Sequence, residues 1–288
     1  MARILVLGTV AQDLVVGLRQ AILSGGHQDG IDKGPRLGGG GANAAVALAR
    51  AGDAPLLVAA VGSDPVGDAL LAELRSLGVD LSLTVRLQGG SSRSIIMTDP
   101  AGERTIVNLR RLLESEPPLR ITSVAADVMY VRSRHQGLAG LMAEMTGRMT
   151  VIAHVPPCAP NSVPAQILVG SKSDLDGGFL ADPFTHGMAV SGGRLEWIVI
   201  THGAKGAEAF GHHGQCLFQP AQKVEVVDST GAGDAFAAGL SHALARKMGM
   251  EQALKIAVAW GTAATQYESS APGEGFPAYP CSSQREIS

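Results

Sequence analysis

The stretch VVDSTGAGDAFAAGL, residues 226–240, determines how the rest of this 288-residue chain is interpreted. An apolar run that ends at Val227 predicts a strand, a polar turn follows at 228–230, and apolar residues at helical spacing continue beyond Asp234. Glycines at a helix start let backbone N–H groups face a ligand without a Cβ in the way, and the first N–H groups of a helix have no partner inside it. The helix dipole adds positive charge there, so the pattern predicts an anion site, for which phosphate is the common ligand.

Asp234 allows two interpretations. As a carboxylate in the first turn of a helix it would offset the helix dipole, which contributes a few tenths to about 1 kcal/mol. A carboxylate inside a predicted anion site has little structural purpose, however. This placement favours a chemical role for Asp234.

The segment 228–234 resembles the carboxy-terminal signature of the ribokinase-like (PfkB) carbohydrate kinases, Asp-Thr-x-Gly-Ala-Gly-Asp, with a conservative serine at Ser229. The resemblance implies that Asp234 is the catalytic base. It also implies that the backbone amides of Gly231, Ala232 and Gly233 hold the phosphoryl group during transfer.

The composition excludes several classes of partner. A net charge of −3 and scattered basic residues, densest at Arg110-Arg111, leave no electrostatic footprint for nucleic acid or an anionic membrane. Cys158, Cys216 and Cys281 lie far apart without metal-ligand spacing, which favours a reduced, cytoplasmic setting. No apolar run approaches the roughly 20 residues of a membrane helix, and the start of the chain becomes polar too soon for a signal peptide.

A second glycine-rich segment, GGGGANAAVALARAG at 38–52, leads into an alanine-rich helical pattern. It fits the minimal dinucleotide fingerprint Gly-x-Gly-x-x-Ala, but no strong strand comes immediately before it and no acidic residue ends the following strand. It resembles instead the amino-terminal signature of the same kinase family, Gly-Gly-x-Gly-Ala-Asn. This resemblance implies that Gly39, Gly40 and Asn43 bind the sugar.

Asp13 lies between a first predicted strand, 3–8, and another apolar run. Taken alone, it is most simply a turn residue that hydrogen-bonds its own backbone. The family resemblance implies instead that its carboxylate binds sugar hydroxyls.

Strands and helices alternate from residue 124 onward, which predicts right-handed βαβ units and a mostly parallel sheet. The resemblance implies a single α/β domain over 1–288, a three-layer α/β/α sandwich. It also implies a small β-sheet lid formed by about 14–18, 31–37 and 83–109, through which a homodimer could form. Arg104, at the edge of this lid, is interpreted as a solvated surface side chain.

The nucleotide side is predicted from Thr201, Gly203 and Gly206, which fit the Thr-x-Gly-x-x-Gly of the family, and from Thr230. No Gly-x4-Gly-Lys-Ser/Thr sequence exists in the chain, so a P-loop is excluded. The family also carries Asn-x-x-Glu, which helps to order Mg²⁺ and the phosphates.

This chain departs from that pattern, with Ser171 and Asp174 at the two positions. Mg²⁺ keeps several waters, so the shorter carboxylate of Asp174 could act through water. The resemblance further implies a monovalent cation, K⁺, at the carbonyls near Asp228 and Thr230, enclosed by the loop 269–275.

The expected function is therefore an ATP- and Mg²⁺-dependent sugar kinase. The Ser-Lys pair at 171–172 and the hairpin at 102–105 look most like the ketohexokinase and sulfofructose kinase types of the family. Two alternatives remain open: a nucleoside kinase of the adenosine type, and a sugar- or nucleotide-binding protein that has lost catalysis.

Overall fold

The structure is a computed structural model that describes residues 1–100, 104–112, 118–133, 135–268, 273 and 276. Its strands are β1 (Arg3–Gly8), β2 (Ala11–Leu18), β3 (Gly30–Gly38), β4 (Ala54–Val58), β5 (Ala60–Gly62), β6 (Val85–Leu87), β7 (Ser92–Thr98), β8 (Arg104–Arg110), β9 (Val128–Arg132), β10 (Thr150–His154), β11 (Ile167–Ser171), β12 (Trp197–Thr201), β13 (Ala207–Gly211) and β14 (Cys216–Gln219). Its helices are α1 (Gly40–Arg50), α2 (Pro65–Ser76), α3 (Pro118–Thr122), α4 (Ala139–Met145), α5 (Gly177–Ala181), α6 (Pro183–Val190), α7 (Ala232–Ala245) and α8 (Met250–Ala264). None of the described helices is both long and apolar enough to cross a membrane.

A large sheet with the strand order β14-β13-β12-β11-β10-β9-β1-β4 forms the centre of the molecule. The strands from β4 to β12 in this order run parallel, whereas β13 and β14 are antiparallel at one edge. Parallel strands are covered on both faces and therefore read as continuous apolar runs, as in 198–200 of β12, where every side chain is buried.

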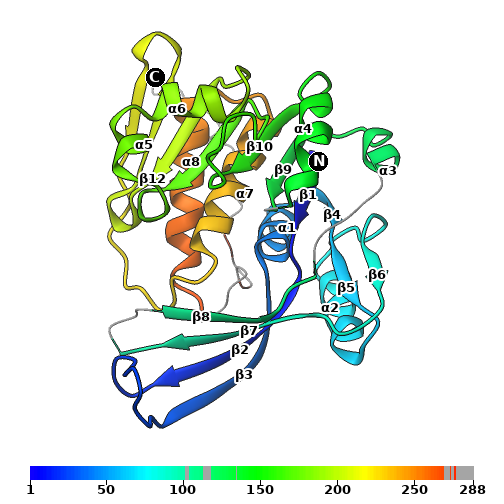
Figure 1. Cartoon of the computed structure of the whole chain (residues 1–288), viewed down its shortest axis with the longest axis vertical. Helices are drawn as coiled ribbons and strands as arrows, with labels where there is room; N and C mark the ends of the chain where they lie inside the picture. The colour runs from blue at the N-terminus through cyan, green and yellow to red at the C-terminus, as the bar shows by residue number, and fades with distance from the viewer. Residues whose placement is uncertain (101–103, 113–117, 134, 269–272, 274–275, 277–288) are drawn as a thin grey trace, which may run out of the picture.

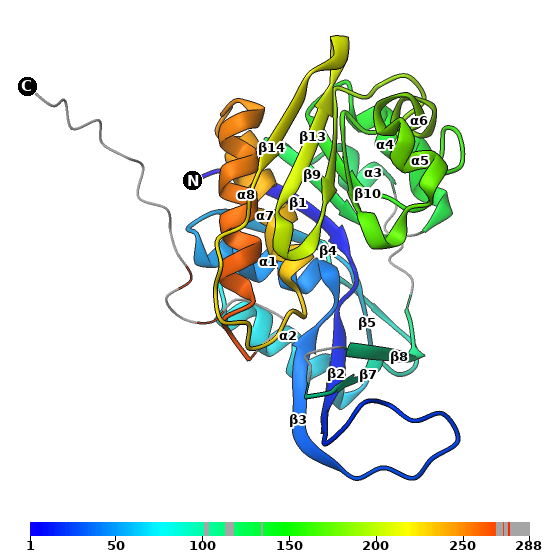
Figure 2. The same cartoon turned by 90° about the vertical axis from the view of Figure 1, so that its left-hand side faces the viewer.

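Helices cover both faces of the large sheet. Alternate residues of β1 enter different cores: Ile4 and Val6 pack with residues of α1, α7 and α8, and Leu5 and Leu7 pack with residues of α4, α5 and α6. Figure 2 shows these two groups of helices on opposite sides of the strands. The predicted three-layer α/β/α sandwich with a mostly parallel sheet is confirmed.

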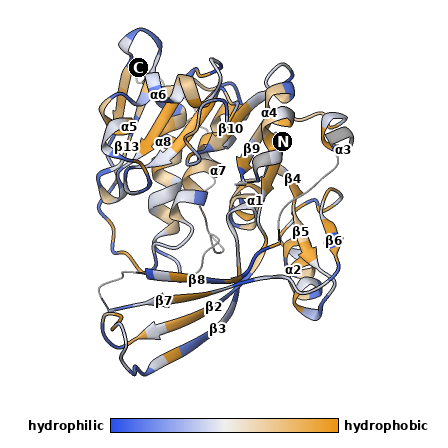
Figure 3. Cartoon of the chain, viewed as in Figure 1, coloured by the Kyte–Doolittle hydropathy of each residue, from blue (hydrophilic) through white to orange (hydrophobic). Residues whose placement is uncertain are grey.

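A separate four-stranded sheet, the small sheet, has the order β3-β2-β7-β8 and stands away from one end of the sandwich (Figure 1). Figure 3 shows that its strands mix hydrophilic and hydrophobic residues, unlike the strands of the large sheet. Arg36, Asp13, Ser94 and Asn108 are direct partners across its strands. Direct partners share a face, so these residues form one polar row across the small sheet.

Asp64 connects the small sheet to the sandwich. It caps α2, because its Oδ1 accepts a hydrogen bond from the backbone N–H of Gly67 at 2.8 Å. The same carboxylate accepts the Ser91 N–H at 2.9 Å and the Ser91 hydroxyl at 2.5 Å, immediately before β7 begins. One side chain therefore fixes both a helix start and the entry to the small sheet.

Two sequence predictions about strands were wrong. Val85–Leu87 does not join the small sheet but pairs with β5 in a sheet of its own, so the predicted lid segment 83–109 supplies only β7 and β8. The run before Val227 forms no strand: Val226 and Val227 are more than half exposed, and the N–H of Val227 donates to the Thr265 carbonyl. The hairpin at 102–105 lies partly outside the described residues.

Candidate active site

Helix α7 begins with a backbone conformation that exposes its amides. Gly231 caps it in the left-handed region, with φ of 78°, which glycine adopts without strain. The N–H of Ala232 donates weakly to the Ser229 carbonyl at 3.3 Å, but within the described residues no acceptor faces the N–H groups of Gly233 and Asp234. No atom lies within 4 Å of a Cβ built on Gly233. The predicted anion site is therefore an open helix start with unpaired donors.

Asp234 lies in the first turn of α7 and is nearly buried, with 12% of its side chain exposed. Its Oδ2 accepts from Nδ2 of Asn43 at 2.9 Å, and its Oδ1 accepts from Nε of Arg132 at 3.1 Å. Three segments far apart in sequence therefore meet at one carboxylate. A carboxylate that only offset the dipole would not need two dedicated donors.

Arg132 is a site residue that the sequence reasoning missed. It follows the buried run 128–131 at the carboxyl end of β9, and side chains at such strand ends face the ligand edge of a parallel sheet. Burial acts to lower its pKa, but the nearby acidic groups, Asp234 first and Asp174 among them, raise it above its ordinary value. The position of Arg132 after a buried strand was the available signal.

The start of α1 lies against the same carboxylate. A Cβ on Gly40 would stand 2.6 Å from Cγ of Arg132 and 3.0 Å from Oδ1 of Asp234, so only glycine fits there. Gly39, with φ of 93°, is equally constrained, because a Cβ would stand 2.4 Å from the Thr9 carbonyl oxygen.

Asn43 is 4% exposed, and its Oδ1 is buried without a hydrogen-bond partner in the described part of the chain. Since its Nδ2 donates to Asp234, the amide carries one satisfied and one unsatisfied end. Buried polar atoms are normally paired, so the Oδ1 indicates a missing donor at this point.

Asp13 is 6% exposed and faces the site from β2. Burial raises its pKa to about 6, against the opposing effects of a hydrogen bond from Ser94 and the positive charge of Arg111. A Cβ on Gly38 would stand 1.8 Å from Oδ2 of Asp13, so the carboxylate occupies the space above a glycine. Asp13 lies within a strand and is therefore not the turn residue considered from sequence.

The predicted nucleotide residues lie at neighbouring strand ends. Ser171 and Thr201 are paired in register at the ends of β11 and β12, and Asp174 follows in an exposed turn. Gly203 and Gly206 both have positive φ in the turn after β12, and a Cβ on Gly206 would stand 2.0 Å from the Gln219 carbonyl oxygen.

Among the described residues, no group of three or more His, Cys, Asp or Glu residues could hold a metal ion by itself. The exposed carboxylate of Asp174 does fit the water-mediated contact to Mg²⁺ expected from the sequence. Asp174 lies in the short turn that follows Ser171 at the end of β11, and the ends of parallel strands form the ligand edge of such a sheet.

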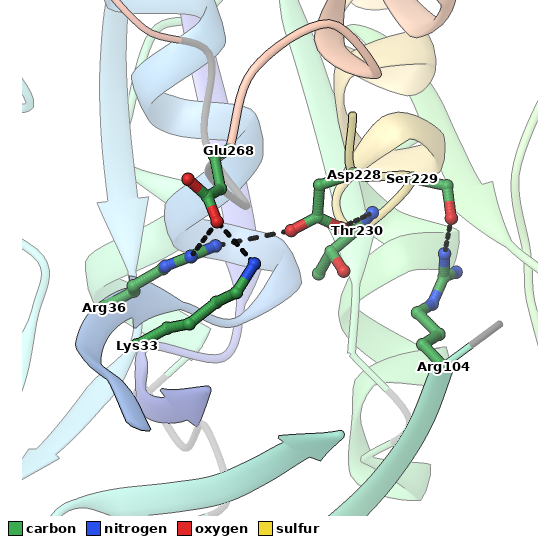
Figure 4. A network of polar contacts seen from close by, with 7 residues as sticks. All are labelled: Lys33, Arg36, Arg104, Asp228, Ser229, Thr230 and Glu268. Carbon is green, nitrogen blue, oxygen red and sulfur yellow. Dashed lines mark hydrogen bonds and ion pairs between the residues drawn. The ribbon is translucent and has the colours of Figure 1, made fainter. Parts of the chain in front are cut away.

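The turn at 228–230 is held by the small sheet. Oδ1 of Asp228 accepts the N–H of Thr230 at 2.8 Å, and its Oδ2 lies 3.3 Å from Nη1 of Arg36. Arg104 is exposed, as expected of a surface arginine, and it also donates to the Ser229 hydroxyl at 2.6 Å. Figure 4 shows these contacts from both sides of the turn.

The remaining polar atom of this turn, Oγ1 of Thr230, is buried and has no partner among the described residues. Thr230 itself is only 7% exposed. A buried hydroxyl beside the open amides of α7 is suited to donate to a ligand at the helix start.

Comparison with known proteins places this site in a family. A profile described as "pfkB family carbohydrate kinase" matches residues 1–137 and 141–274. The chain is 29% identical over 289 residues to an ATP-dependent ribose-1-phosphate kinase from Halopiger xanaduensis, covering 94% of this chain and 95% of the relative. It is 26% identical to a ribokinase from Schizosaccharomyces pombe, with 94% of each covered.

A solved structure agrees with these sequence relatives at the level of the fold. The ribokinase from Cryptococcus neoformans var. grubii in complex with ADP superposes with a TM-score of 0.76 at 23% identity, covering 94% of this chain and 97% of that one. The helix start, the two signatures and the fold thus agree with the family match. The chain belongs to the pfkB family of carbohydrate kinases and is a phosphotransferase that acts on an alcohol group of a sugar.

Proposed function

We propose that this chain transfers the γ-phosphate of ATP to a sugar hydroxyl, with Asp234 as general base and the amides of 231–234 as the anion hole. The observation that carries the proposal is the carboxylate of Asp234, nearly buried, held by Asn43 and Arg132, and placed at unpaired helix N–H groups. A base and an anion hole side by side are the two parts that phosphoryl transfer to an alcohol requires.

The acceptor would lie between α1 and the small sheet. A sugar hydroxyl can donate to the unsatisfied Oδ1 of Asn43, and others can donate to the carboxylate of Asp13. The backbone at Gly39 and Gly40 packs closely against Thr9 and Arg132, which brings the start of α1 beside Asp234. An acceptor hydroxyl in this space lies beside Asp234, which accepts its proton during attack.

The nucleotide would lie along the ends of β11 and β12, with its phosphates directed to the start of α7. Ser171, Thr201, Gly203 and Gly206 line this route, and the hydroxyl of Thr230 is available to the phosphates. Mg²⁺, when bound with the nucleotide, neutralises phosphate charge, and Asp174 would hold it through water. A positioned base contributes about 10²–10⁴-fold, and an oxyanion donor about 10²–10³-fold.

We propose that the small sheet is a lid over the acceptor. Asp13 belongs to its polar row, and two of its arginines already contact the turn at 228–230. Closure would exclude water, which otherwise competes with the sugar for the phosphoryl group. A homodimer through this lid and a cytoplasmic location remain predictions of the family resemblance; a monomer mass in sedimentation equilibrium would contradict the former.

The test is ADP release from ATP and Mg²⁺ with a panel of pentoses, hexoses, ketoses, phosphosugars and nucleosides. We expect turnover with a sugar in the wild type, a kcat about 10²–10⁴-fold lower in Asp234→Asn, and nucleotide affinity retained. Asp68→Asn makes the same chemical change at an exposed ion pair with Arg86 and should leave kcat unchanged.

Each alternative has its own signature in this test. Turnover restricted to nucleosides would replace the sugar by a nucleoside acceptor. Binding of sugar and nucleotide without turnover would identify a binding protein. Loss of nucleotide binding in Asp234→Asn, equal to its loss of turnover, would contradict the role of general base.

A further inference from the structure

The family resemblance predicts a monovalent cation beside Asp228 and Thr230. In the structure, the guanidinium group of Arg36 already brings a positive charge to this position. Nη1 of Arg36 lies 3.3 Å from Oδ2 of Asp228, and the two side chains are only 15% and 12% exposed. The other oxygen of Asp228 accepts the N–H of Thr230. Both oxygens of this carboxylate are therefore engaged by groups of the chain itself.

A cation does not fit beside this pair. Arginine stays protonated at any physiological pH, and its charge cannot be removed to admit another. A second unit charge about 4 Å from a guanidinium, at an effective dielectric constant of about 20, is repelled strongly enough to weaken its binding roughly a thousandfold. The carboxylate charge that would attract a K⁺ ion to this position is therefore neutralised by Arg36.

The ion pair is part of a larger contact between the small sheet and the sandwich (Figure 4). Nη2 of Arg36 lies 3.6 Å from Oε1 of Glu268, and Nζ of Lys33 lies 2.5 Å from the same oxygen. The hydrogen bond and charge of Lys33, followed by the charge of Arg36, keep the pKa of Glu268 below its ordinary value. Glu268 thus orients Arg36 toward the turn from the other side.

Arg36 also links the two halves of the site. It is the direct partner of Asp13 across β2 and β3, so one cross-strand pair reaches both the acceptor carboxylate and the turn that precedes Gly231. A bound cation would order the turn at 228–230 independently of the acceptor site. An arginine on the small sheet orders the turn only when that sheet is in place.

We propose that Arg36 is a positioning residue that replaces the monovalent cation and orders the turn leading into the anion hole. This inference rests on the proposed kinase function. The enzyme then needs no K⁺, and its anion hole is set by contact with the small sheet.

The experiment measures kcat and the melting temperature in KCl and in N-methyl-D-glucamine chloride at equal ionic strength. In the wild type, kcat should differ between the two salts by less than about twofold. The melting temperature should be the same in both salts within the error of the scan. In Arg36→Met, kcat should fall about tenfold or more in N-methyl-D-glucamine chloride, the loss expected when a hydrogen-bonded charge is removed. K⁺ or millimolar guanidinium should restore part of it and raise the melting temperature.

Lys33→Met is the matched control, because it removes a cation from the same strand that contacts Glu268 but not Asp228. It should change kcat only slightly and respond to neither K⁺ nor guanidinium. A purely structural role for Arg36 would lower stability without this rescue.

Either of two results would overturn the inference while the proposed function stands: a wild type that K⁺ stimulates tenfold, or an Arg36→Met variant as active as wild type without K⁺. If Arg36→Met fails to fold, the inference is tested with Arg36→Lys and with the comparison of the two salts in the wild type. A wild type that releases no ADP with any acceptor would contradict the proposed function instead. The melting temperature of the wild type in the two salts would still test the inference about the cation.

Discussion

The two glycine-rich helix starts of this chain, at α1 and α7, are similar in sequence but have different roles. At the start of α1, the N–H groups of Gly41 and Ala42 both donate to the Thr9 carbonyl, and a Cβ on Gly41 would stand 2.5 Å from the carbonyl carbon of Gly8. At the start of α7, the N–H groups of Gly233 and Asp234 face no acceptor within the described residues, and the space beside Gly233 is open.

The difference shows that glycine at a helix start has two separate uses. In α1 it permits close packing against β1, which consumes the donors and leaves no anion site. In α7 it leaves donors exposed to a ligand. The dinucleotide fingerprint considered at Gly39 therefore fails for a physical reason, because the amides of Gly41 and Ala42 are already occupied.

The largest expected effect is on stability, in Gly41→Ala. Its Cβ would overlap the backbone of β1, which cannot move as a side chain can, so we expect a loss of more than about 3 kcal/mol in the free energy of unfolding, measured by urea denaturation. Gly140→Ala in α4, where a Cβ meets nothing within 4 Å, is the control and should gain about 0.5–1 kcal/mol. Equal stability of the two variants would remove the contrast between the helix starts.

The next effect concerns Asp13, beside the start of α1. Its pKa is higher in the folded chain, about 6, than the ordinary value of 3.8, so ionisation favours the unfolded chain. As pH rises through this window the folded state loses up to about 3 kcal/mol, and the loss is complete above pH 6. Asp13→Asn should therefore match wild type in stability near pH 4 and exceed it by pH 7, while binding sugar less well.

Urea denaturation at several pH values between 4 and 7 measures this difference. Asp68→Asn, which makes the same change at an exposed carboxylate, is the control. A stability difference for Asp13→Asn that is constant with pH would show that the carboxylate is not the cause.

The smallest effect in free energy is confined to turnover, in Gly233→Ala. Nothing near Gly233 opposes a Cβ, so stability should be unchanged or slightly higher. The methyl group would enter the space in front of the open amides, and kcat should fall about 10²-fold, or about 2.7 kcal/mol, as for loss of one oxyanion donor. Full activity with normal stability would show that the phosphoryl group binds elsewhere.

Much of the fold was predictable because its signals are local. The uninterrupted apolar runs of β1 and β12, buried on both faces, could only be central strands. Asp234 and Asn43 were predicted as site residues from two short signatures, and the structure brings them within 2.9 Å of each other.

The features that were not predicted depend on contacts between distant segments, which a local sequence pattern does not specify. Val85–Leu87 has three residues and no distinguishing register, so its pairing with β5 rather than with the small sheet is decided by the path of the chain. The sequence around Arg132 is that of any strand end, and only its hydrogen bond to Asp234 identifies it as a residue of the candidate site. Arg36 and Asp228 are 192 positions apart and share no sequence pattern.

That separation has a consequence for the order of folding. Asn43 and Asp234 are 191 positions apart, so the site cannot assemble before most of the chain has been synthesised. Contacts between such distant segments form late, after local helices and neighbouring strands, because closing long loops costs entropy first. A nascent chain on the ribosome therefore carries Asp13 and the glycine-rich start of α1 well before Asp234 and the start of α7. Under the proposed function, it cannot hydrolyse ATP until most of the chain has been synthesised.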